Sequence, residues 1–367
     1  MGYKKGLEGI IAAETEIGFI DGEQGKLVYR GEWAKDLAIN KEFEEVAYLI
    51  WYGKLPNKQE LEELKSSMKK YRGIPDYIHS ILENLPEDMD FMSVLRTCIS
   101  ALGTSKFSWP PTVEQAIQIT SIAPTIIAYW YRKQQNKSFV EPDLNLDHVE
   151  NYLYMIKGNK PEESHTKALT AYLILTIEHG MNASTFSARV VISTESELIS
   201  AITAAIGAMK GPLHGGAPSG VIKMLEEIGN KNNIESWVKN SLEKGEKLMG
   251  FGHRVYKTRD PRAEALKIVS KQLTGQSEWL ELALELEDKA IKILNEYKPG
   301  RKLYTNVEFY AAAVLKGISL PQELFTPTFT ASRIVGWTGH AIEQSKNNRI
   351  FRPASKYVGK SPSNEPV

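Results

Sequence analysis

The chain has 367 residues, of which 42% are hydrophobic and 25% charged. This composition supports a sizeable apolar core and excludes a disordered or collagen-like chain. Lys and Arg together number 45, as do Asp and Glu, so no net charge attracts the protein to nucleic acid or to an anionic membrane. We therefore expect neither of them as a partner.

Features of the termini and cysteine usage indicate a cytoplasmic protein. The single cysteine, Cys98, excludes an internal disulfide and any Cys-based metal motif. Residues 1–18 lack the apolar core of a signal peptide, and their acidic residues argue against a transit peptide. The most apolar run, residues 122–130, is too short to span a bilayer.

Residues 17–31, IGFIDGEQGKLVYRG, place apolar and β-branched residues on both sides of a Gly-rich turn and predict a small β-hairpin. Beyond residue 36, apolar residues recur at helical spacing, as in residues 43–50 before the stop at Gly53. Residues 266–273 and 280–294 carry similar stripes. We predict a mainly α fold in which the hairpin is the only persuasive β signal.

The length suggests two domains. The Gly-rich segments 211–220 and 250–261 are too unusual for plain linkers, and a helical stretch rich in Lys and Glu follows the first of them. We predict a large helical domain from residues 1–220, a small inserted helical domain from 221–322, and a return to the large domain in 323–367.

The segment GFGHRVYKTRDPRA, residues 250–263, sets His253 beside Arg254, Lys257, Arg259 and Arg262 on a glycine loop that leads into a helix. Seven of the twelve arginines lie after residue 250. Because the arginine fork suits carboxylate and phosphate, this segment predicts an anion site. The alternative is a solvated basic loop. Neither GxGxxG nor a Walker sequence is present, so a nucleotide fingerprint is not supported.

The segment GPLHGGAP, residues 211–218, flanks His214 with glycines that permit close approach of a ligand. A helix beginning near Ala217 would point its positive dipole end at this loop and lower the pKa of the histidine. A neutral His214 could then donate a hydrogen bond to a developing oxyanion. The alternative is a Gly-rich turn with a satisfied histidine.

Three further residues are candidates for acid–base or anion chemistry. Glu308 lies between Val307 and Phe309, where desolvation would raise its pKa and suit a general base; the alternative is an ordinary helix-face glutamate. Arg333 and Arg352 are flanked by apolar residues, and we expect both to be anchored and able to grip a dicarboxylate. The alternative is a pair of structural ion pairs.

Other chemistries find no support in the sequence. GxSxG and HExxH are absent, and the single Glu162-x-x-His165 lacks the second copy that di-iron bundles require, so no metal is expected. We interpret His79, His148 and His165 as surface residues and place His340 on a helix face.

Taken together, these segments resemble the citrate synthase family, in the short form typical of bacteria and archaea. GLEGIIAAETEIGFIDGEQGKLVYRG at 6–31, FEEVAYLIWYGKLP at 43–56, EHGMNASTFSARV at 178–190 and RIFRPASKYVG at 349–359 match the family in order and spacing, as do the two histidine loops. The resemblance runs essentially from end to end.

The resemblance implies an almost all-helical homodimer whose small domain closes over the substrates. It also implies a Claisen-type condensation of acetyl-CoA with oxaloacetate, then thioester hydrolysis to citrate and CoA, with no cofactor beyond these substrates. By motif, His214 resembles the residue that hydrogen-bonds the enol oxygen, His253 the one that polarises the ketone, and Glu308 the base. The remaining implied contacts are those to oxaloacetate and citrate (His179, Arg262, Arg333, and Arg352 from across the dimer) and those to CoA (Arg254, Lys257, Arg301, Lys302).

Glu308 departs from the family pattern. The pattern usually has Asp in NVDFYSG, whereas residues 306–312 read NVEFYAA. The extra methylene moves the carboxylate by roughly 1 Å, and such a misplacement can cost about a hundredfold in rate. Two alternatives stay open: a 2-methylcitrate synthase that uses propionyl-CoA, and a catalytically weak homologue.

Overall fold

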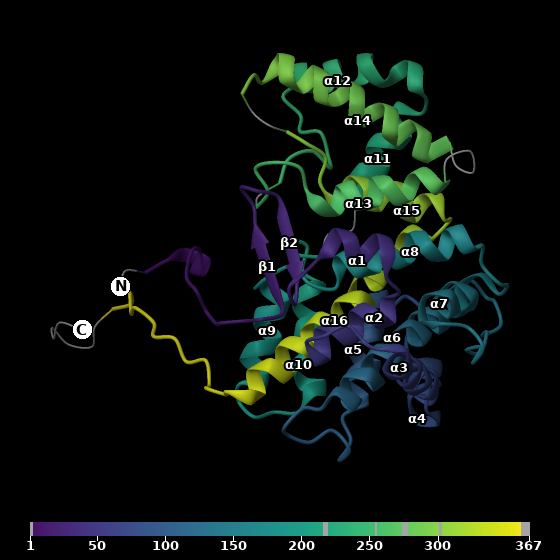
Figure 1. The fold of residues 1–367 in the computed structure, drawn as a ribbon, viewed down its shortest axis with the longest axis vertical. Coiled ribbons are helices and arrows are strands. Elements are labelled where there is room, and N and C mark those ends of the chain that lie inside the picture. Colours follow the sequence, from purple (N-terminus) through teal and green to yellow (C-terminus); the bar gives the residue numbers. More distant parts are fainter. Residues whose placement is uncertain (1–2, 216–218, 254, 274–277, 301–302, 361–367) are drawn as a thin grey trace.

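The computed structural model describes residues 3–215, 219–253, 255–273, 278–300 and 303–360. These residues form sixteen α-helices, four short 3-10 helices and one small sheet (Figure 1), which confirms the predicted mainly α fold. The α-helices are α1 (Ala34–Asn40), α2 (Phe43–Tyr52), α3 (Lys58–Lys70), α4 (Asp76–Asn84), α5 (Phe91–Ala101), α6 (Val113–Gln134), α7 (His148–Lys157), α8 (Glu163–Thr176), α9 (Ala183–Ile192), α10 (Leu198–Met209), α11 (Ser219–Ile228), α12 (Ile234–Glu243), α13 (Pro261–Ser270), α14 (Glu278–Tyr297), α15 (Val307–Gly317) and α16 (Phe325–Lys346). The 3-10 helices are η1 (Lys5–Leu7), η2 (Lys231–Asn233), η3 (Lys271–Leu273) and η4 (Gln322–Leu324).

The predicted hairpin is confirmed and gains a short third strand. β1 (Gly18–Asp21), β2 (Lys26–Tyr29) and β3 (Glu32–Trp33) form an antiparallel sheet in that order. In register, Gly18 lies opposite Tyr29, Asp21 opposite Lys26, and Val28 opposite Trp33.

The turn between β1 and β2 supports the loop that carries His253. The Asp21 carboxylate accepts the backbone N–H groups of Glu23 and Gln24, at 3.0 and 2.9 Å, and so closes the turn. The Gly22 carbonyl accepts the Lys257 N–H at 2.8 Å. A Cβ atom at Gly22 would lie 2.2 Å from the Val255 carbonyl oxygen, so only glycine allows this close approach.

Helix α16 runs through the middle of the body and contacts α2, α6, α8, α9 and α10. Its close packing depends on Gly336, where a Cβ atom would lie 2.2 Å from the Ile177 carbonyl oxygen. No helix among the described residues is both long and apolar enough to cross a membrane. Because α16 is buried, Arg333 lies in the interior of the protein rather than in solvent.

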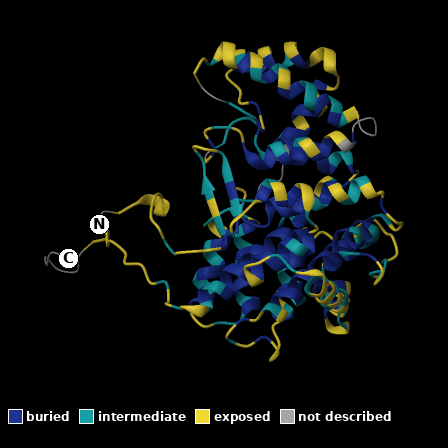
Figure 2. Cartoon of the chain, viewed as in Figure 1, coloured by how far each residue is buried: buried dark blue, intermediate teal, exposed yellow. Residues whose placement is uncertain are grey.

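Helices α11 to α15 lie at one end of the molecule, at the top of Figure 1. Of these, α13 packs against α1 and α8, and α15 packs against α8 and α13. The segments that carry the nominated side chains therefore meet where this end joins the body. Figure 2 shows that the two terminal segments project away from the body and are exposed.

His148 corrects an expectation from sequence. It is only 4% exposed, whereas we interpreted it as a surface residue. Its ring stacks on Phe43, with ring centroids 5.0 Å apart, and the backbone N–H of His148 donates to the Glu44 carboxylate at 2.8 Å. The start of α7 packs against α2, and the resulting burial lowers the pKa of His148 to about 3.

Candidate active site

A cavity of about 210 Å³ lies at the junction of α8, α13, α15 and α16. Such a volume suits a small metabolite or the reactive end of a larger one. Six side chains nominated from the sequence line it together: His179, His214, His253, Arg262, Glu308 and Arg333. The tertiary structure thus brings together residues that are spread over 155 positions of the chain, from 179 to 333.

His179 follows the end of α8 and faces the His253 loop. Its Nε2 lies 3.2 Å from the Tyr256 hydroxyl, and its ring centroid lies 5.9 Å from that of His253. Burial, together with the positive charges of Arg262 and Arg333, holds the pKa of His179 well below its usual range. His179 is therefore neutral at physiological pH.

The protonation of His253 follows from its hydrogen bonds. Its Nδ1 accepts the backbone N–H groups of Val255 and Tyr256, both at 3.0 Å, so Nδ1 carries no proton. In the neutral ring the proton is therefore on Nε2, which lies 3.2 Å from Nη2 of Arg262. Burial, and next to it Arg262, lowers the pKa of His253 to about 4. Two donors that face the same region are suited to hold an acceptor oxygen between them.

Arg262 is held by a buried carboxylate that sequence reasoning missed. Asp260, 2% exposed, accepts from the backbone N–H and Nε of Arg262 at 3.0 Å each and from its Nη2 at 2.9 Å. Its second oxygen also accepts the Val307 N–H at 3.1 Å, at the start of α15. Asp260 thus fixes Arg262 relative to the helix of Glu308. The local signal was an N-cap position before Pro261.

Arg333 is directed into the cavity from α16. Its Nε donates to the Thr176 carbonyl at 2.7 Å, and its guanidinium lies 4.7 Å from the centre of the Phe329 ring. Its two terminal nitrogens make no hydrogen bond with the described residues, and the side chain lines the cavity. These nitrogens can therefore meet an anionic ligand.

His214 lies on a tight turn whose geometry requires glycine. A Cβ atom at Gly215 would lie 2.0 Å from the Met209 carbonyl oxygen. His214 Nε2 accepts the Ser184 backbone N–H at 3.3 Å and contacts the Ser184 hydroxyl at 2.7 Å. Burial, then Arg333, lowers its pKa. We expected this effect from a helix beginning near Ala217, which lies outside the described residues.

Glu308 lies in the first turn of α15, where the Asn306 side chain caps the helix by accepting the Glu308 N–H at 3.0 Å. The side chain is exposed along the cavity wall rather than enclosed among apolar residues as we expected. Loss of hydration nevertheless raises its pKa, and Arg262 opposes this increase. The predicted direction of the pKa shift is confirmed.

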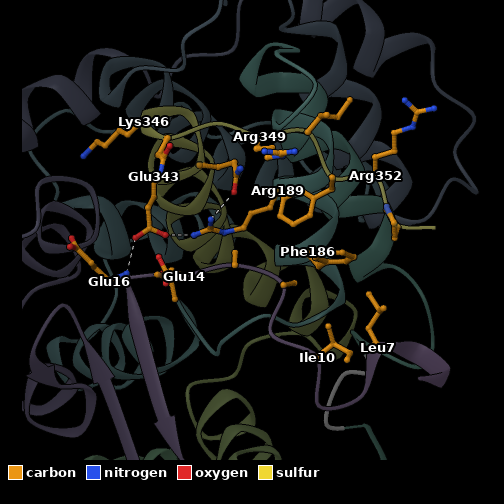
Figure 3. A pocket seen from close by; sticks show the side chains of 18 of the residues that line it. Leu7, Ile10, Glu14, Glu16, Phe186, Arg189, Glu343, Lys346, Arg349 and Arg352 are labelled. Carbon is orange, nitrogen blue, oxygen red and sulfur yellow. Dashed lines mark hydrogen bonds and ion pairs between the residues drawn. The ribbon is translucent and has the colours of Figure 1, made fainter. Parts of the chain in front are cut away.

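Arg352 lies elsewhere in the single chain. It is exposed, which corrects our expectation that it is anchored among apolar residues, and it does not line the cavity with Arg333. It lines a groove of about 790 Å³ between the N- and C-terminal segments (Figure 3). Residues 352–360, which follow α16, are all exposed in the single chain.

The predicted CoA contacts fall largely outside the described residues. Arg254, Arg301 and Lys302 belong to the segments that the structure does not describe. Lys257 is exposed beside the hairpin turn. Among the described residues, no group of three His, Cys, Asp or Glu side chains is arranged to hold a metal ion.

Comparison with known proteins gives one consistent result. The family model described as citrate synthase, C-terminal domain, matches residues 6–354. Citrate synthase 2 of Bacillus subtilis is 42% identical, over 97% of this chain and 95% of its own. The 2-methylcitrate synthase of Shewanella oneidensis is 38% identical over 97% and 95%. The crystal structure of citrate synthase from Thermotoga maritima is 41% identical with a TM-score of 0.85, over 99% of this chain and 98% of that one. A Thermoplasma acidophilum citrate synthase, solved as a ternary complex with carboxymethyl coenzyme A and oxaloacetate, is 33% identical with a TM-score of 0.87, over 99% of this chain and 98% of that one.

Proposed function

The chain belongs to the citrate synthase family, and we propose that it condenses acetyl-CoA with oxaloacetate and hydrolyses the resulting thioester to citrate and CoA. The observation that carries this proposal is the convergence of two arginines, three histidines and one glutamate on a single small cavity. Arginine forks match carboxylates. Arg262 and Arg333 thus bind the two carboxylates of oxaloacetate, with His179 beside them.

The donors at His253 and Arg262 act on the ketone of oxaloacetate. Because Nε2 of His253 carries the proton, it donates to the ketone oxygen and withdraws electron density from the carbonyl carbon. Arg262 Nη2, 3.2 Å from Nε2, supports the same oxygen. The negative charge that develops there when the new carbon–carbon bond forms is stabilised by both groups.

Glu308 and His214 act together on the acyl-CoA. The α-proton of a thioester has a pKa of roughly 20, so a carboxylate removes it at a useful rate only if the enol oxygen is stabilised at the same time. Glu308 takes the proton from the methyl group. His214, whose Nε2 accepts the Ser184 N–H, keeps its proton on Nδ1 and donates a hydrogen bond from Nδ1–H to the thioester oxygen. The enol carbon then attacks the ketone carbon.

Residues 221–322 form the small domain in this proposal, between the two parts of a large domain formed by 1–220 and 323–367. Its movement toward the large domain excludes water during condensation. Arg254, Lys257, Arg301 and Lys302 bind the CoA phosphates. The compartment is the cytoplasm, in keeping with a single free and buried cysteine, Cys98.

The active form is a homodimer in which Arg352 completes the site of the partner subunit. Exposed apolar side chains on both terminal segments support this assembly, because they would otherwise remain in water. Ile11 is 88% exposed and Val358 is 86% exposed. The groove between these segments, lined by Ile10, Phe186 and Arg352 (Figure 3), offers a surface for the second copy.

The acyl substrate is tested by comparing turnover of acetyl-CoA and propionyl-CoA with oxaloacetate, followed by release of the free thiol. We expect the higher kcat/KM with acetyl-CoA. A preference for propionyl-CoA would identify a 2-methylcitrate synthase, the activity named for one relative. No turnover with either thioester would refute the proposed function.

The assignment of the two histidine loops is tested with His214→Ala and His253→Ala. Each should lower kcat/KM by roughly 100- to 1,000-fold, because each removes a donor from a developing oxyanion. His79→Ala is the matched control, since His79 is partly exposed and does not line the cavity. Near-parental turnover of a folded His214 or His253 variant would refute the role of that loop.

A further inference from the structure

A row of buried polar side chains joins the candidate active site to the groove between the chain ends. It consists of Glu178, His340 and Arg189, which are at most 2% exposed, and ends at Glu343. Residues 178 and 340 are separated by 162 positions in the chain. Burying such groups is costly unless each has a partner, so their hydrogen bonds show where the protons and charges of the row lie.

The hydrogen bonds of His340 show which of its two ring nitrogens carries the proton. Nε and Nη2 of Arg189 donate to His340 Nδ1 at 3.0 and 2.9 Å, and arginine can only donate. Nδ1 therefore carries no proton. The proton of the neutral ring is on Nε2, which donates to the Glu178 carboxylate at 2.9 Å. His340 thus connects a buried cation to a buried anion without itself bearing charge.

At the cavity end, Glu178 holds the turn that carries His179. One of its carboxylate oxygens accepts the N–H of Gly180, a residue with φ of +67°. The Glu178 backbone carbonyl accepts the Tyr29 hydroxyl at 2.9 Å. Burial lowers the pKa of Arg333, and the negative charge of the same carboxylate opposes this effect. Two groups assigned to oxaloacetate thus depend on Glu178.

At the groove end, the row meets the N-terminal segment. Arg189 donates to Gln344 at 2.9 Å and also to Glu343 (Figure 3). The Glu343 carboxylate accepts the Glu16 backbone N–H at 2.8 Å, and Arg30 lies 4.0 Å from it. Arg189 and Glu343 line the same groove as Arg352.

We propose that His340 is a positioning residue for oxaloacetate binding. Through Glu178 and Arg189, His340 links the turn of His179 to the packing of the N-terminal segment on Glu343. The inference rests on the proposed function, because it assigns its effect to the oxaloacetate subsite. His340 touches no substrate. Loss of its three hydrogen bonds leaves Glu178 and Arg189 without their shared partner, so the His179 turn shifts and oxaloacetate binding weakens.

The test compares His340→Leu with His340→Gln. The leucine variant should raise the KM for oxaloacetate by roughly tenfold or more, with little change in the KM for acetyl-CoA. The glutamine variant, which retains one acceptor and one donor, should recover most of the difference. Thr338→Val is the matched control, because Thr338 is a buried polar residue of the same helix outside the row. It should leave both KM values near those of the parent.

A second variant tests the groove end independently and should fold even if His340→Leu does not. Glu343→Gln, at a side chain that is 17% exposed, should raise the KM for oxaloacetate in the same direction. Its effect should be less than additive with that of His340→Gln. The inference would be overturned if the KM for oxaloacetate were unchanged in both single variants, or if the KM values for oxaloacetate and acetyl-CoA rose equally. These results differ from failure of the proposed function, in which the parent itself shows no turnover.

Discussion

Replacing Asp260 with asparagine removes the charge that holds Arg262 and leaves the size of the side chain unchanged. The carboxylate is 2% exposed and accepts four hydrogen bonds, three from Arg262 and one from the Val307 N–H. In the variant, the amide NH₂ group must face at least one of these donors. Arg262, itself 4% exposed, loses its buried counter-charge.

The expected effect is large because one partner of a buried ion pair is removed. Such a change costs about 3 to 5 kcal/mol, since the remaining charge stays buried and unpaired. Arg262 and the start of α15 should both shift, because Asp260 is the contact between them. We therefore also expect a rise in the KM for oxaloacetate and a fall in kcat.

The assay is denaturant unfolding followed by circular dichroism, together with steady-state kinetics. Asp288→Asn is the matched control, because the Asp288 side chain is 73% exposed and its nearest cation, Lys267, lies 3.9 Å away. It should change the free energy of unfolding by no more than about 0.5 kcal/mol. An Asp260→Asn protein as stable as this control, with parental kinetics, would refute the reasoning.

Three further predictions concern the catalytic base, the pH dependence of stability and the shared site of the dimer. Glu308→Gln should lower kcat by about 100- to 10,000-fold, because an amide cannot accept the proton. Glu308→Asp should raise kcat, because it returns the carboxylate to the usual distance. Substantial thiol release by the folded glutamine variant would assign the base to another group. The pKa of His253 is about 4 in the folded chain and about 6.5 when unfolded, so only the unfolded chain takes up this proton between those values. The free energy of unfolding should therefore fall as pH drops from 6.5 toward 4, and less so in His253→Gln; parallel curves for the two proteins would contradict this. Heterodimers of an Arg352→Ala chain with a His253→Ala chain should regain part of the activity, whereas no recovery in verified heterodimers would argue against a shared site.

Local sequence predicted much of the secondary structure, and the sequence also pointed to six of the residues that line the cavity. The apolar spacing of residues 43–50 and the stop at Gly53 correspond to α2, which ends where Gly53 adopts a φ of +81°. The Gly-rich turn after β1 corresponds to the observed hairpin. Such features depend on neighbours within a few positions, so their physical causes are present in a short stretch of sequence. The family motifs supplied six side chains that line one cavity.

The groups that hold those side chains could not be found in this way. In the sequence, Asp260 looks like an ordinary helix cap. Its second carboxylate oxygen nevertheless accepts a hydrogen bond from the Val307 N–H at the start of α15, 47 positions away. His340 was placed only on a helix face, and it is fully buried between Glu178 and Arg189. No local periodicity or motif in the sequence indicates either of these contacts.

What the sequence by itself determined about this protein is therefore its helical class, its hairpin and the chemical groups of its site. The tertiary structure alone decided that His148 is buried and that Arg352 lies apart from Arg333 in the single chain. The physical reason is that burial and electrostatic partners come from elements far apart in the sequence. Their positions depend on how α2, α8 and α16 pack together, and this packing is a property of the whole chain.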